Sequence, residues 1–347
     1  MAKAVKLADI AERVGVSTVT VSKALSGQKG VSEEVREKIH SIAKELGYQQ
    51  PSAARKSQNQ KSYNIGILIS ERFLDKYESF YWQMYQAVAT RATAKECFTM
   101  LEVIGMAEEE NGRLPKLVQE RKVDGIIVIG KMMDDYLQHL NTEAGIPVIY
   151  LDYYNGREAS DSVISNSYYG TYELTYYLYR MGHRKIAYIH GDDTSVTKNR
   201  LGSFYRTLQR LGIEEPDEYV RPSFYRDADL AGERTGELLD LKDPPTCILY
   251  PDDYAALGGI NEIRERGLRI PEDISVAGYD GINIAQVLEP RLTTLCQDTA
   301  AIGRIAAERL IELIEHPKTT VIEKYTVDGT LFKGASVKTV YPPRGFK

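Results

Sequence analysis

Polar side chains with the chemistry of a hydroxyl-binding site follow several apolar runs of the sequence. Asp152, Asp252 and Asp280 each lie at or just beyond the end of a run that predicts a strand, and Arg200 opens a predicted helix behind another such run. A carboxylate accepts hydrogen bonds from neighbouring hydroxyls, and a guanidinium fork donates several at once. We therefore expect these residues to bind a sugar or a similar small polyol.

Each of these residues also has a purely structural interpretation. Asp152 is equally typical of a turn, and Arg200 and Asp280 could form an ion pair with each other. Asp253 precedes a helix-forming run and is expected to be the N-cap of that helix. The apolar face of a sugar also requires an aromatic platform, for which Phe80, Tyr81, Phe224 and Tyr225 are candidates, although aromatic residues at helical spacing commonly pack in a core.

No motif of the sequence predicts catalysis or a bound cofactor. Neither glycine-rich nucleotide fingerprint occurs, and no G-x-S-x-G elbow is present. The five histidines are scattered, and Cys97, Cys247 and Cys296 are far apart and lack zinc-type spacing. We expect no enzyme activity, no cofactor and no metal, and we interpret the cysteines as reduced thiols of a cytoplasmic protein. No apolar run reaches membrane-spanning length.

The elements that must position the polar residues alternate along the chain. Apolar runs predict strands at 64–69, 98–104, 125–129, 147–151, 185–190, 246–250 and 274–277. Amphipathic stretches between them predict helices at 80–93, 168–181, 200–211, 254–266 and 302–314. Such alternation is typical of parallel sheets covered by helices on both faces. Ligands of these sheets bind beyond the carboxyl ends of the strands, where the polar residues lie.

The first 25 residues follow a different pattern. Apolar residues at helical spacing predict two short helices joined by a turn at Gly15, where a permissive backbone suits the bend. Ser17 is a good N-cap for the second helix. The residues available to DNA on that helix are Ser17, Thr18, Val19, Thr20, Ser22 and Lys23. This pattern predicts a helix-turn-helix that enters a major groove, with an ordinary helical hairpin as the alternative.

The charge is divided unevenly along the chain. Residues 1–61 contain 11 Lys and Arg against 6 Asp and Glu, a net charge of +5, whereas the whole chain carries −5. The remaining residues therefore carry −10. A basic head on an acidic body favours contact of the head alone with a polyanion.

A run of motifs extends this pattern across the head. It consists of Leu7-Ala8-Asp9-Ile10-Ala11, Gly15-Val16-Ser17, Thr20-Val21-Ser22, Leu25-Ser26-Gly27, Val31-Ser32, Arg36-Glu37-Lys38-Ile39, Leu46-Gly47-Tyr48 and Ala54-Arg55. This run resembles the headpiece of the lactose-repressor/galactose-repressor (LacI/GalR) family of bacterial transcription regulators. The resemblance implies that Arg55 contacts DNA from a hinge. Many relatives carry Arg in place of Lys23, and relatives that bend DNA insert a Leu where this chain has Ser57, so we expect modest bending.

The resemblance extends into the predicted sheets. The matching motifs are Leu151-Asp152, Arg200-Leu201-Gly202-Ser203-Phe204, Asp252-Asp253-Tyr254-Ala255-Ala256-Leu257-Gly258, Gly278-Tyr279-Asp280 and Thr293-Thr294-Leu295-Cys296-Gln297. It places Gln297 at the effector site from a crossover between lobes, and it places Ser165 where some relatives have a pocket aromatic. Asp252 replaces an Asn that is common in the family.

The resemblance also implies the domain organisation. We expect a small all-α helix-turn-helix headpiece and an α/β core of two parallel-sheet lobes resembling a periplasmic binding protein. The expected boundaries are 1–48 for the headpiece, 49–62 for the hinge, and 63–347 for the core, with lobe 1 at about 63–162 and 295–328 and lobe 2 at about 163–294 and 329–347.

Together these features predict a cytoplasmic, homodimeric repressor that binds double-stranded operator DNA under the control of a small-molecule effector, expected to be a sugar. The alternatives are a solute-binding protein without a DNA role and, within the family, a regulator that responds to a purine or to a partner protein. The basic head disfavours the first alternative.

Overall fold

The protein is described here from a computed structural model, which divides into two compact units, residues 1–61 and 62–347. The described residues are 5–25, 30–46, 48, 63–74, 80–154, 160–191, 194–213, 217–224, 226–317 and 321–340. The predicted sites Arg55 and Tyr225, together with Ser57, lie outside them.

The first unit contains three helices, α1 (Leu7–Val14), α2 (Thr18–Leu25) and α3 (Glu33–Glu45). Ile10, Val21 and Ile39, one from each helix, are fully buried against one another. Gly15 ends α1 with a φ of 81°, a left-handed conformation that favours glycine. The predicted pair of helices with a turn at Gly15 is therefore confirmed.

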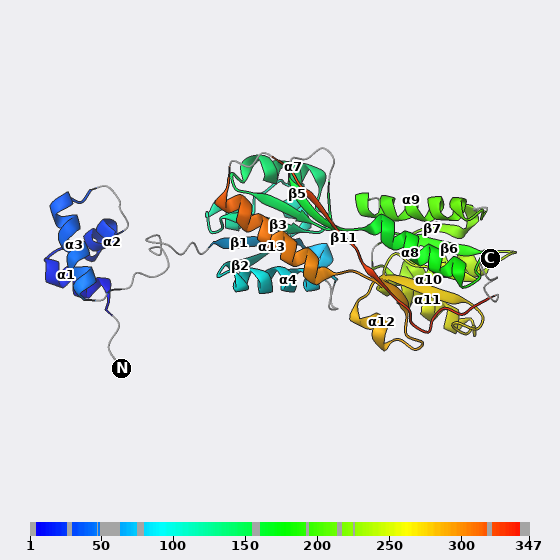
Figure 1. Ribbon diagram of the computed structural model, residues 1–347. Helices are drawn as coiled ribbons and strands as arrows, with labels where there is room; N and C mark the ends of the chain where they lie inside the picture. Colours follow the sequence, from blue (N-terminus) through cyan, green and yellow to red (C-terminus); the bar gives the residue numbers. More distant parts are fainter. Residues whose placement is uncertain are drawn as a thin grey trace. The chain divides into compact units, whose positions relative to one another are not determined.

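The second unit contains two six-stranded sheets, each with helices on both faces (Figure 1). The first sheet has the order β11-β5-β4-β3-β1-β2, and all of its strand pairs are parallel. Its strands are β1 (Asn64–Ser70), β2 (Phe98–Ile104), β3 (Gly125–Ile129), β4 (Val148–Leu151), β5 (Asp161–Ser165) and β11 (Lys324–Val327). Its helices are α4 (Phe80–Ala94), α5 (Met106–Glu110), α6 (Lys116–Gln119), α7 (Asp134–Glu143) and α13 (Thr299–Glu315). We call this sheet and its helices lobe 1.

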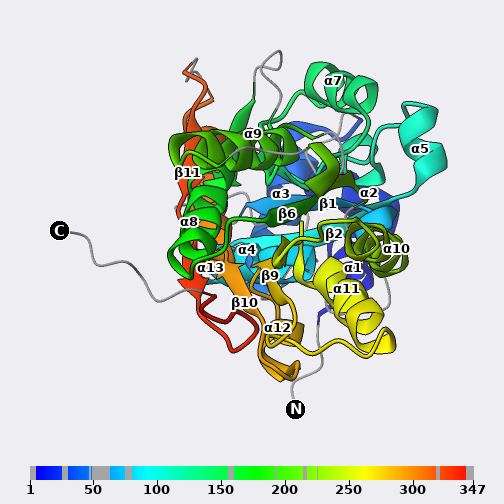
Figure 2. The same cartoon turned by 90° about the vertical axis from the view of Figure 1, so that its right-hand side faces the viewer.

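The second sheet has the order β12-β10-β9-β8-β6-β7 and is parallel except for the antiparallel pair of β10 and β12. Its strands are β6 (Ile186–His190), β7 (Val220–Pro222), β8 (Cys247–Leu249), β9 (Ser275–Asp280), β10 (Thr293–Cys296) and β12 (Thr330–Phe332). Its helices are α8 (Ser167–Arg180), α9 (Ser195–Arg210), α10 (Ala228–Leu239), α11 (Asp253–Glu265) and α12 (Asn283–Val287). We call this sheet and its helices lobe 2. Figure 2 looks onto it, with α8 and α9 on one side of the sheet and α10 and α11 on the other.

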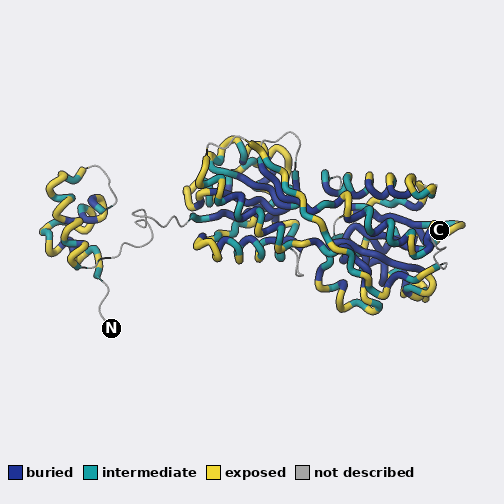
Figure 3. The backbone as a smooth tube through the Cα atoms, viewed as in Figure 1, coloured by how far each residue is buried: buried dark blue, intermediate teal, exposed yellow. Residues whose placement is uncertain are grey.

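Alternation along the strands divides the core between the two faces of each sheet. In β1, Ile65, Ile67 and Ile69 pack beneath α4 and α13, whereas Leu68 packs on the α7 side. The strands consequently form the buried interior in Figure 3. Helices α4 and α13 approach each other closely at Gly303. A Cβ at this position would lie 2.5 Å from the Cβ of Ala87 on α4, so only glycine fits there without a shift.

The chain crosses between the lobes three times, from β5 to α8, from β10 to α13 and from β11 to β12 (Figure 1). Before the first crossing the first sheet extends to Ser165, and before the second crossing the second sheet extends to Cys296; β11 and β12 then add one later strand to each sheet. The predicted α/β architecture of two parallel-sheet lobes is confirmed, and the predicted strands differ from the observed ones mainly by a few residues at their ends. The helix predicted at 200–211 begins earlier, at Ser195, because Thr194 accepts a hydrogen bond from the Thr197 amide and caps it. Within the described residues, no helix has the length and apolar character needed to cross a membrane.

Candidate functional site

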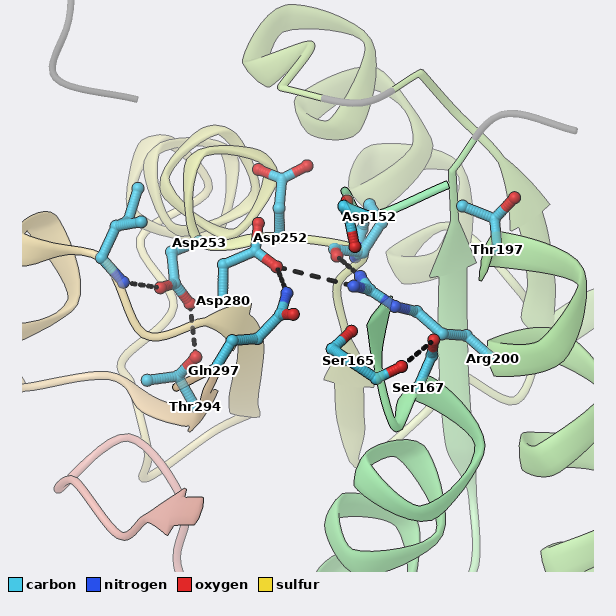
Figure 4. A network of polar contacts seen from close by, with 12 residues as sticks. Asp152, Ser165, Ser167, Thr197, Arg200, Asp252, Asp253, Asp280, Thr294 and Gln297 are labelled. Carbon is cyan, nitrogen blue, oxygen red and sulfur yellow. Dashed lines mark hydrogen bonds and ion pairs between the residues drawn. The ribbon is translucent and has the colours of Figure 1, made fainter. Parts of the chain in front are cut away.

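Predicted site residues from both lobes lie close together near the crossovers (Figure 4). Asp152 follows β4 of lobe 1, whereas Asp280 ends β9 and Arg200 lies on α9 of lobe 2. Gln297 follows β10 at the point where the chain leaves lobe 2 for α13. The carboxyl ends of parallel strands bring these side chains, which are far apart in sequence, to one place.

Arg200 is buried in this cluster, with 4% of its surface exposed. Its Nη1 donates to the carbonyl oxygen of Pro251 at 2.8 Å, and its Nη2 lies 3.6 Å from Oδ1 of Asp280. The guanidinium carbon lies 3.6 Å from the centroid of the Tyr279 ring, in a cation–π contact. Arg200 and Asp280 thus form the ion pair that we considered. Among the described residues, however, Nε of Arg200 has no hydrogen-bond partner.

Asp280 and Gln297 are joined directly, because Nε2 of Gln297 donates to Oδ1 of Asp280 at 2.6 Å. Asp280 has a φ of 94°, which is unfavourable for a residue with a side chain. Oε1 of Gln297 is buried, and no described residue donates to it. This pair therefore presents an acceptor whose partner is not provided by the described protein groups.

Asp152 approaches the cluster from lobe 1. It has a φ of 55°, and its Oδ2 accepts a hydrogen bond from the Tyr81 hydroxyl at 3.1 Å. Its Oδ1 is buried without a hydrogen-bond partner among the described residues. Burial raises the pKa of Asp152 to about 7; Arg200 opposes the rise, Asp280 adds to it, and the hydrogen bond from Tyr81 opposes it.

The two neighbouring aspartates have roles that differ from those suggested by the sequence. The N-cap of α11 is Asp252, whose Oδ1 accepts from the amides of Tyr254 and Ala255, so the prediction of Asp253 as the cap is wrong. Asp253 instead accepts hydrogen bonds from the Thr294 hydroxyl and the Ile282 amide. Asp252 has the extended backbone that a cap requires, whereas Asp253 is already helical.

The carboxyls of both residues are fully buried. Burial and the nearby Asp280 raise the pKa of Asp252 to about 6, while its backbone hydrogen bonds from Ala255 and Arg226 oppose the rise. Burial also raises the pKa of Asp253 well above its ordinary value. Asp252 lies beside the cluster, but the helix cap and the Arg226 amide already occupy its two oxygens.

The four aromatic candidates lie in different surroundings. Phe80 is buried in the core of lobe 1, as expected for an aromatic residue that packs in a core. Tyr81 is buried in the same core, but its hydroxyl donates a hydrogen bond to Asp152. Phe224 is 61% exposed beyond β7, so the described arrangement does not place it in a closed wall. Tyr225 lies outside the described residues. Ser165, at the end of β5, is buried, and its Oγ has no hydrogen-bond partner in the described chain.

Sequence reasoning missed the roles of Tyr279 and Ser223. Tyr279 supplies the ring beneath Arg200, and Ser223, just after β7, has a buried hydroxyl without a hydrogen-bond partner among the described residues. The position of Tyr279 beside Asp280 in a predicted strand end was a usable signal, whereas nothing near Ser223 in the sequence indicated its burial. The described residues contain no group of three acidic, histidine or cysteine side chains that could hold a metal ion.

The second candidate site is the outer face of α2 in the first unit. Oγ of Ser17 accepts from the Thr20 amide at 3.1 Å, which confirms the predicted N-cap. The side chains of Ser17, Thr18, Val19, Ser22 and Lys23 are exposed, and that of Thr20 is half-buried. Val19 is 61% exposed although it is apolar. The face is therefore small, mostly polar and open to a groove.

Two family models match the chain in separate regions. Residues 6–51 match the model described as bacterial regulatory proteins, lacI family. Residues 175–337 match the model of a periplasmic binding protein-like domain. The first match covers the head, and the second covers most of lobe 2, α13 and β11 of lobe 1, and two of the three crossovers.

Similar proteins cover nearly the whole chain. The ribose operon repressor of Haemophilus influenzae is 30% identical over 91% of this chain and 95% of its own length. The HTH-type transcriptional repressor PurR of Vibrio atlanticus is 29% identical over 92% of this chain and 97% of its own. The crystal structure of the lac repressor dimer bound to operator and the anti-inducer ONPF has a TM-score of 0.72 at 26% identity, covering 97% of this chain and 100% of that chain.

These relatives are named as repressors rather than enzymes, which agrees with the expectation of no catalytic activity. The head motifs, the two-lobed core and similarity along nearly the whole chain lead to one assignment. The chain belongs to the LacI/GalR family of DNA-binding transcription repressors with an effector-binding core.

Proposed function

We propose that this repressor is controlled by a sugar that binds between the lobes at Asp152, Arg200, Asp280 and Gln297. The observation that carries the proposal is the set of buried polar atoms without hydrogen-bond partners among the described residues: Oδ1 of Asp152, Oγ of Ser165, Nε of Arg200 and Oε1 of Gln297. A buried polar group without a partner costs about 1–3 kcal/mol. A ligand that satisfies these atoms would therefore stabilise the arrangement of the lobes that brings them together.

The hydrogen-bonding character of these atoms favours a polyol. Asp152, when ionised, and Gln297 offer acceptors, Ser165 can donate or accept, and Arg200 donates. A sugar hydroxyl both donates and accepts, so one ring can satisfy all four. A phosphate or carboxylate carries no donor when ionised and would lie against the carboxylates of Asp152 and Asp280.

The second candidate effector is a purine, because PurR is among the similar proteins. A purine base also donates from ring nitrogens, and the buried carboxylates could accept those bonds. Asp252, where the family commonly has Asn, adds one buried carboxyl to the surroundings of the cluster. A sugar and a purine require aromatic surfaces of different size. Phe224, one of the candidates for such a surface, is exposed in the described structure.

On the DNA side, we propose that Thr18, Val19 and Lys23 contact base edges and that Ser17, Thr20 and Ser22 contact phosphates. The exposure of α2 and its cap at Ser17 support this assignment. We further propose that residues 1–48 form the headpiece and that residues 49–62 form a hinge that contributes Arg55. Lys23 donates to guanine without the bidentate fork that arginine offers.

We also propose that the repressor acts as a cytoplasmic homodimer. The strand β2 lies at the edge of the first sheet, and its side chains Phe98, Met100 and Val103 are 63%, 38% and 44% exposed. An apolar edge strand is a site for association with another chain, and the solved lac repressor is a dimer. Phe98→Asp should therefore increase the fraction of monomer in sedimentation experiments.

A thermal-shift screen on the full chain tests the effector proposal. The panel contains ribose and other mono- and disaccharides, sugar phosphates, and purine bases. We expect one neutral sugar to raise the melting temperature of the parent and to change its affinity for an operator selected from random DNA. A response to purine bases alone would replace the sugar by the second candidate, and a response to sugar phosphates alone would contradict the argument from the carboxylates.

A further inference from the structure

Tyr154 connects the two lobes beside the polar cluster without belonging to it. It follows Asp152 by two residues and therefore extends from lobe 1. Two residues of α9 in lobe 2 bind it: Oγ of Ser195 donates to the carbonyl oxygen of Tyr154 at 2.9 Å, and Nδ2 of Asn199 donates to its hydroxyl at 3.0 Å. One residue thus carries two hydrogen bonds from the opposite lobe.

Tyr154 is held firmly to lobe 1. Nζ of Lys324, on strand β11, lies 3.2 Å from the centroid of the Tyr154 ring. The preceding residue, Tyr153, is 3% exposed, and its hydroxyl donates to Oδ1 of Asp134 at 2.8 Å. The Tyr153 ring also packs edge-on against Tyr150 of β4. The backbone that leads to Tyr154 is therefore anchored to the body of lobe 1.

The contacts of Tyr154 with α9 affect the polar cluster because the residues on both sides are close in sequence to members of the cluster. Asn199 precedes Arg200 on α9, and Asp152 lies two residues before Tyr154. Fixing Tyr154 against the first turns of α9 consequently fixes the lobe-1 carboxylate relative to the lobe-2 guanidinium. The lobes also meet at an apolar contact. Ile282 of lobe 2 is buried in the core cluster of lobe 1, and Tyr254 on α11 of lobe 2 packs against the same cluster.

We propose that Tyr154 is an interlobe latch and a positioning residue for the effector site. It favours the arrangement in which Asp152 faces Arg200, before any effector is bound. Losing one of its hydrogen bonds shifts the balance between closed and open arrangements by about fivefold, given a net contribution of roughly 1 kcal/mol per hydrogen bond. The latch involves the lobes alone and would act in the same way with a sugar or a purine effector.

The test measures the distance between the lobes in the full chain without any effector. Spin labels are attached at Gln138→Cys on α7 and Gln209→Cys on α9, both exposed positions, in a Cys296→Ser background because Cys97 and Cys247 are buried. A minority of labelled chains is mixed with unlabelled chains, so that each distance reports one molecule. Pulsed electron resonance then gives the distribution of interlobe distances.

Tyr154→Phe removes the hydroxyl contact and keeps the ring over Lys324. We expect it to increase the population at long distances about fivefold. The matched control is Tyr172→Phe on α8, where the ring stacks on other tyrosines and lies outside the latch. Asn199→Ala should match Tyr154→Phe, and the double variant should open no further than either single variant, because both changes remove one contact.

Ser195→Ala tests the second hydrogen bond without altering the tyrosine, and it keeps the test valid if Tyr154→Phe folds poorly. Melting temperatures of all variants establish that the distances come from folded protein. Distributions of Tyr154→Phe and Ser195→Ala that coincide with those of the parent and of Tyr172→Phe would overturn the latch. Strictly additive opening by Tyr154→Phe and Asn199→Ala would overturn the assigned contact between them.

Discussion

The outer face of α2 presents exposed side chains on a regular helix, whereas the cluster between the lobes is buried and includes two aspartates with positive φ. Water solvates the exposed groups on α2, so we expect each proposed DNA contact there to contribute modestly and to depend on salt. In the cluster, several polar atoms have no protein partner among the described residues. We therefore expect single changes on α2 to weaken DNA binding by modest amounts that add together. Single changes in the cluster should cause large losses of the effector response.

The largest expected effect is that of Arg200→Ala. It removes the guanidinium that contacts Pro251, Asp280 and Tyr279, and it leaves a buried carboxylate with less compensation, at a cost of several kcal/mol. We expect operator binding without effector to be retained and the response to the sugar identified by thermal shift to be abolished, as measured by fluorescence anisotropy of labelled operator.

Two outcomes would contradict this interpretation of Arg200. A parental response to the sugar would show that the pocket is assigned to the wrong residues. Loss of operator binding together with early melting would show that the ion pair with Asp280 is mainly structural. Lys185→Ala, which removes an exposed ion pair with Asp243 on lobe 2, is the matched control and should change neither property.

The next effect in size is that of Lys23→Ala on α2. If Lys23 contacts a guanine, specific operator binding should weaken by about 1–3 kcal/mol while binding to random DNA changes little. Competition titrations at fixed salt separate the two affinities. An equal loss on both kinds of DNA would make Lys23 a phosphate contact and would remove base recognition from that position.

A pH titration distinguishes the buried cluster from the exposed helix. Asp152, with a pKa raised to about 7, and Asp252, with a pKa raised to about 6, bind more protons in the native chain than in the unfolded chain between about pH 4 and pH 7. Their contribution to the free energy of unfolding therefore falls as pH rises through this window. Chemical denaturation at several pH values should show this slope, and Asp152→Asn should flatten it most clearly between about pH 6 and pH 7, where Asp252 contributes little.

The same carboxyl should make effector affinity depend on pH. Sugar binding should tighten as pH rises through about 7, because ionised Asp152 becomes a stronger acceptor. Calorimetric titrations at pH 6 and pH 8 measure this change. Affinity that is independent of pH in the parent would mean that Oδ1 of Asp152 does not accept a hydrogen bond from the sugar.

The smallest effect is expected for Tyr81→Phe. This change removes the hydrogen bond to Oδ2 of Asp152 and should weaken sugar binding by about 1 kcal/mol. Because that hydrogen bond lowers the pKa of Asp152, its loss should move the midpoint of the pH dependence upward. A midpoint that moves downward would show that Tyr81 acts on Asp152 in another way.

Much of the fold could be predicted from local patterns. The turn at Gly15, the cap at Ser17 and the strand from residues 98 to 104 each depend on residues that are neighbours in sequence. Hydrophobic periodicity and backbone preference are local properties, so a single chain displays them. The error at Asp252 and Asp253 shows the limit, because both residues have a suitable side chain and only the backbone conformation decides which one caps α11.

The sequence by itself determined the residue types at the strand ends, the exposed helix that we propose contacts DNA, and the alternation that builds two parallel sheets. The tertiary structure alone decided that Gln297 pairs with Asp280, that Tyr279 lies beneath Arg200 and that Tyr154 joins α9. The first two contacts depend on the packing of β9, β10 and α9 in lobe 2, and the third depends on the two lobes lying against each other. Periodicity cannot encode them, because burial and hydrogen-bond geometry arise only when segments that are far apart in sequence fold against one another.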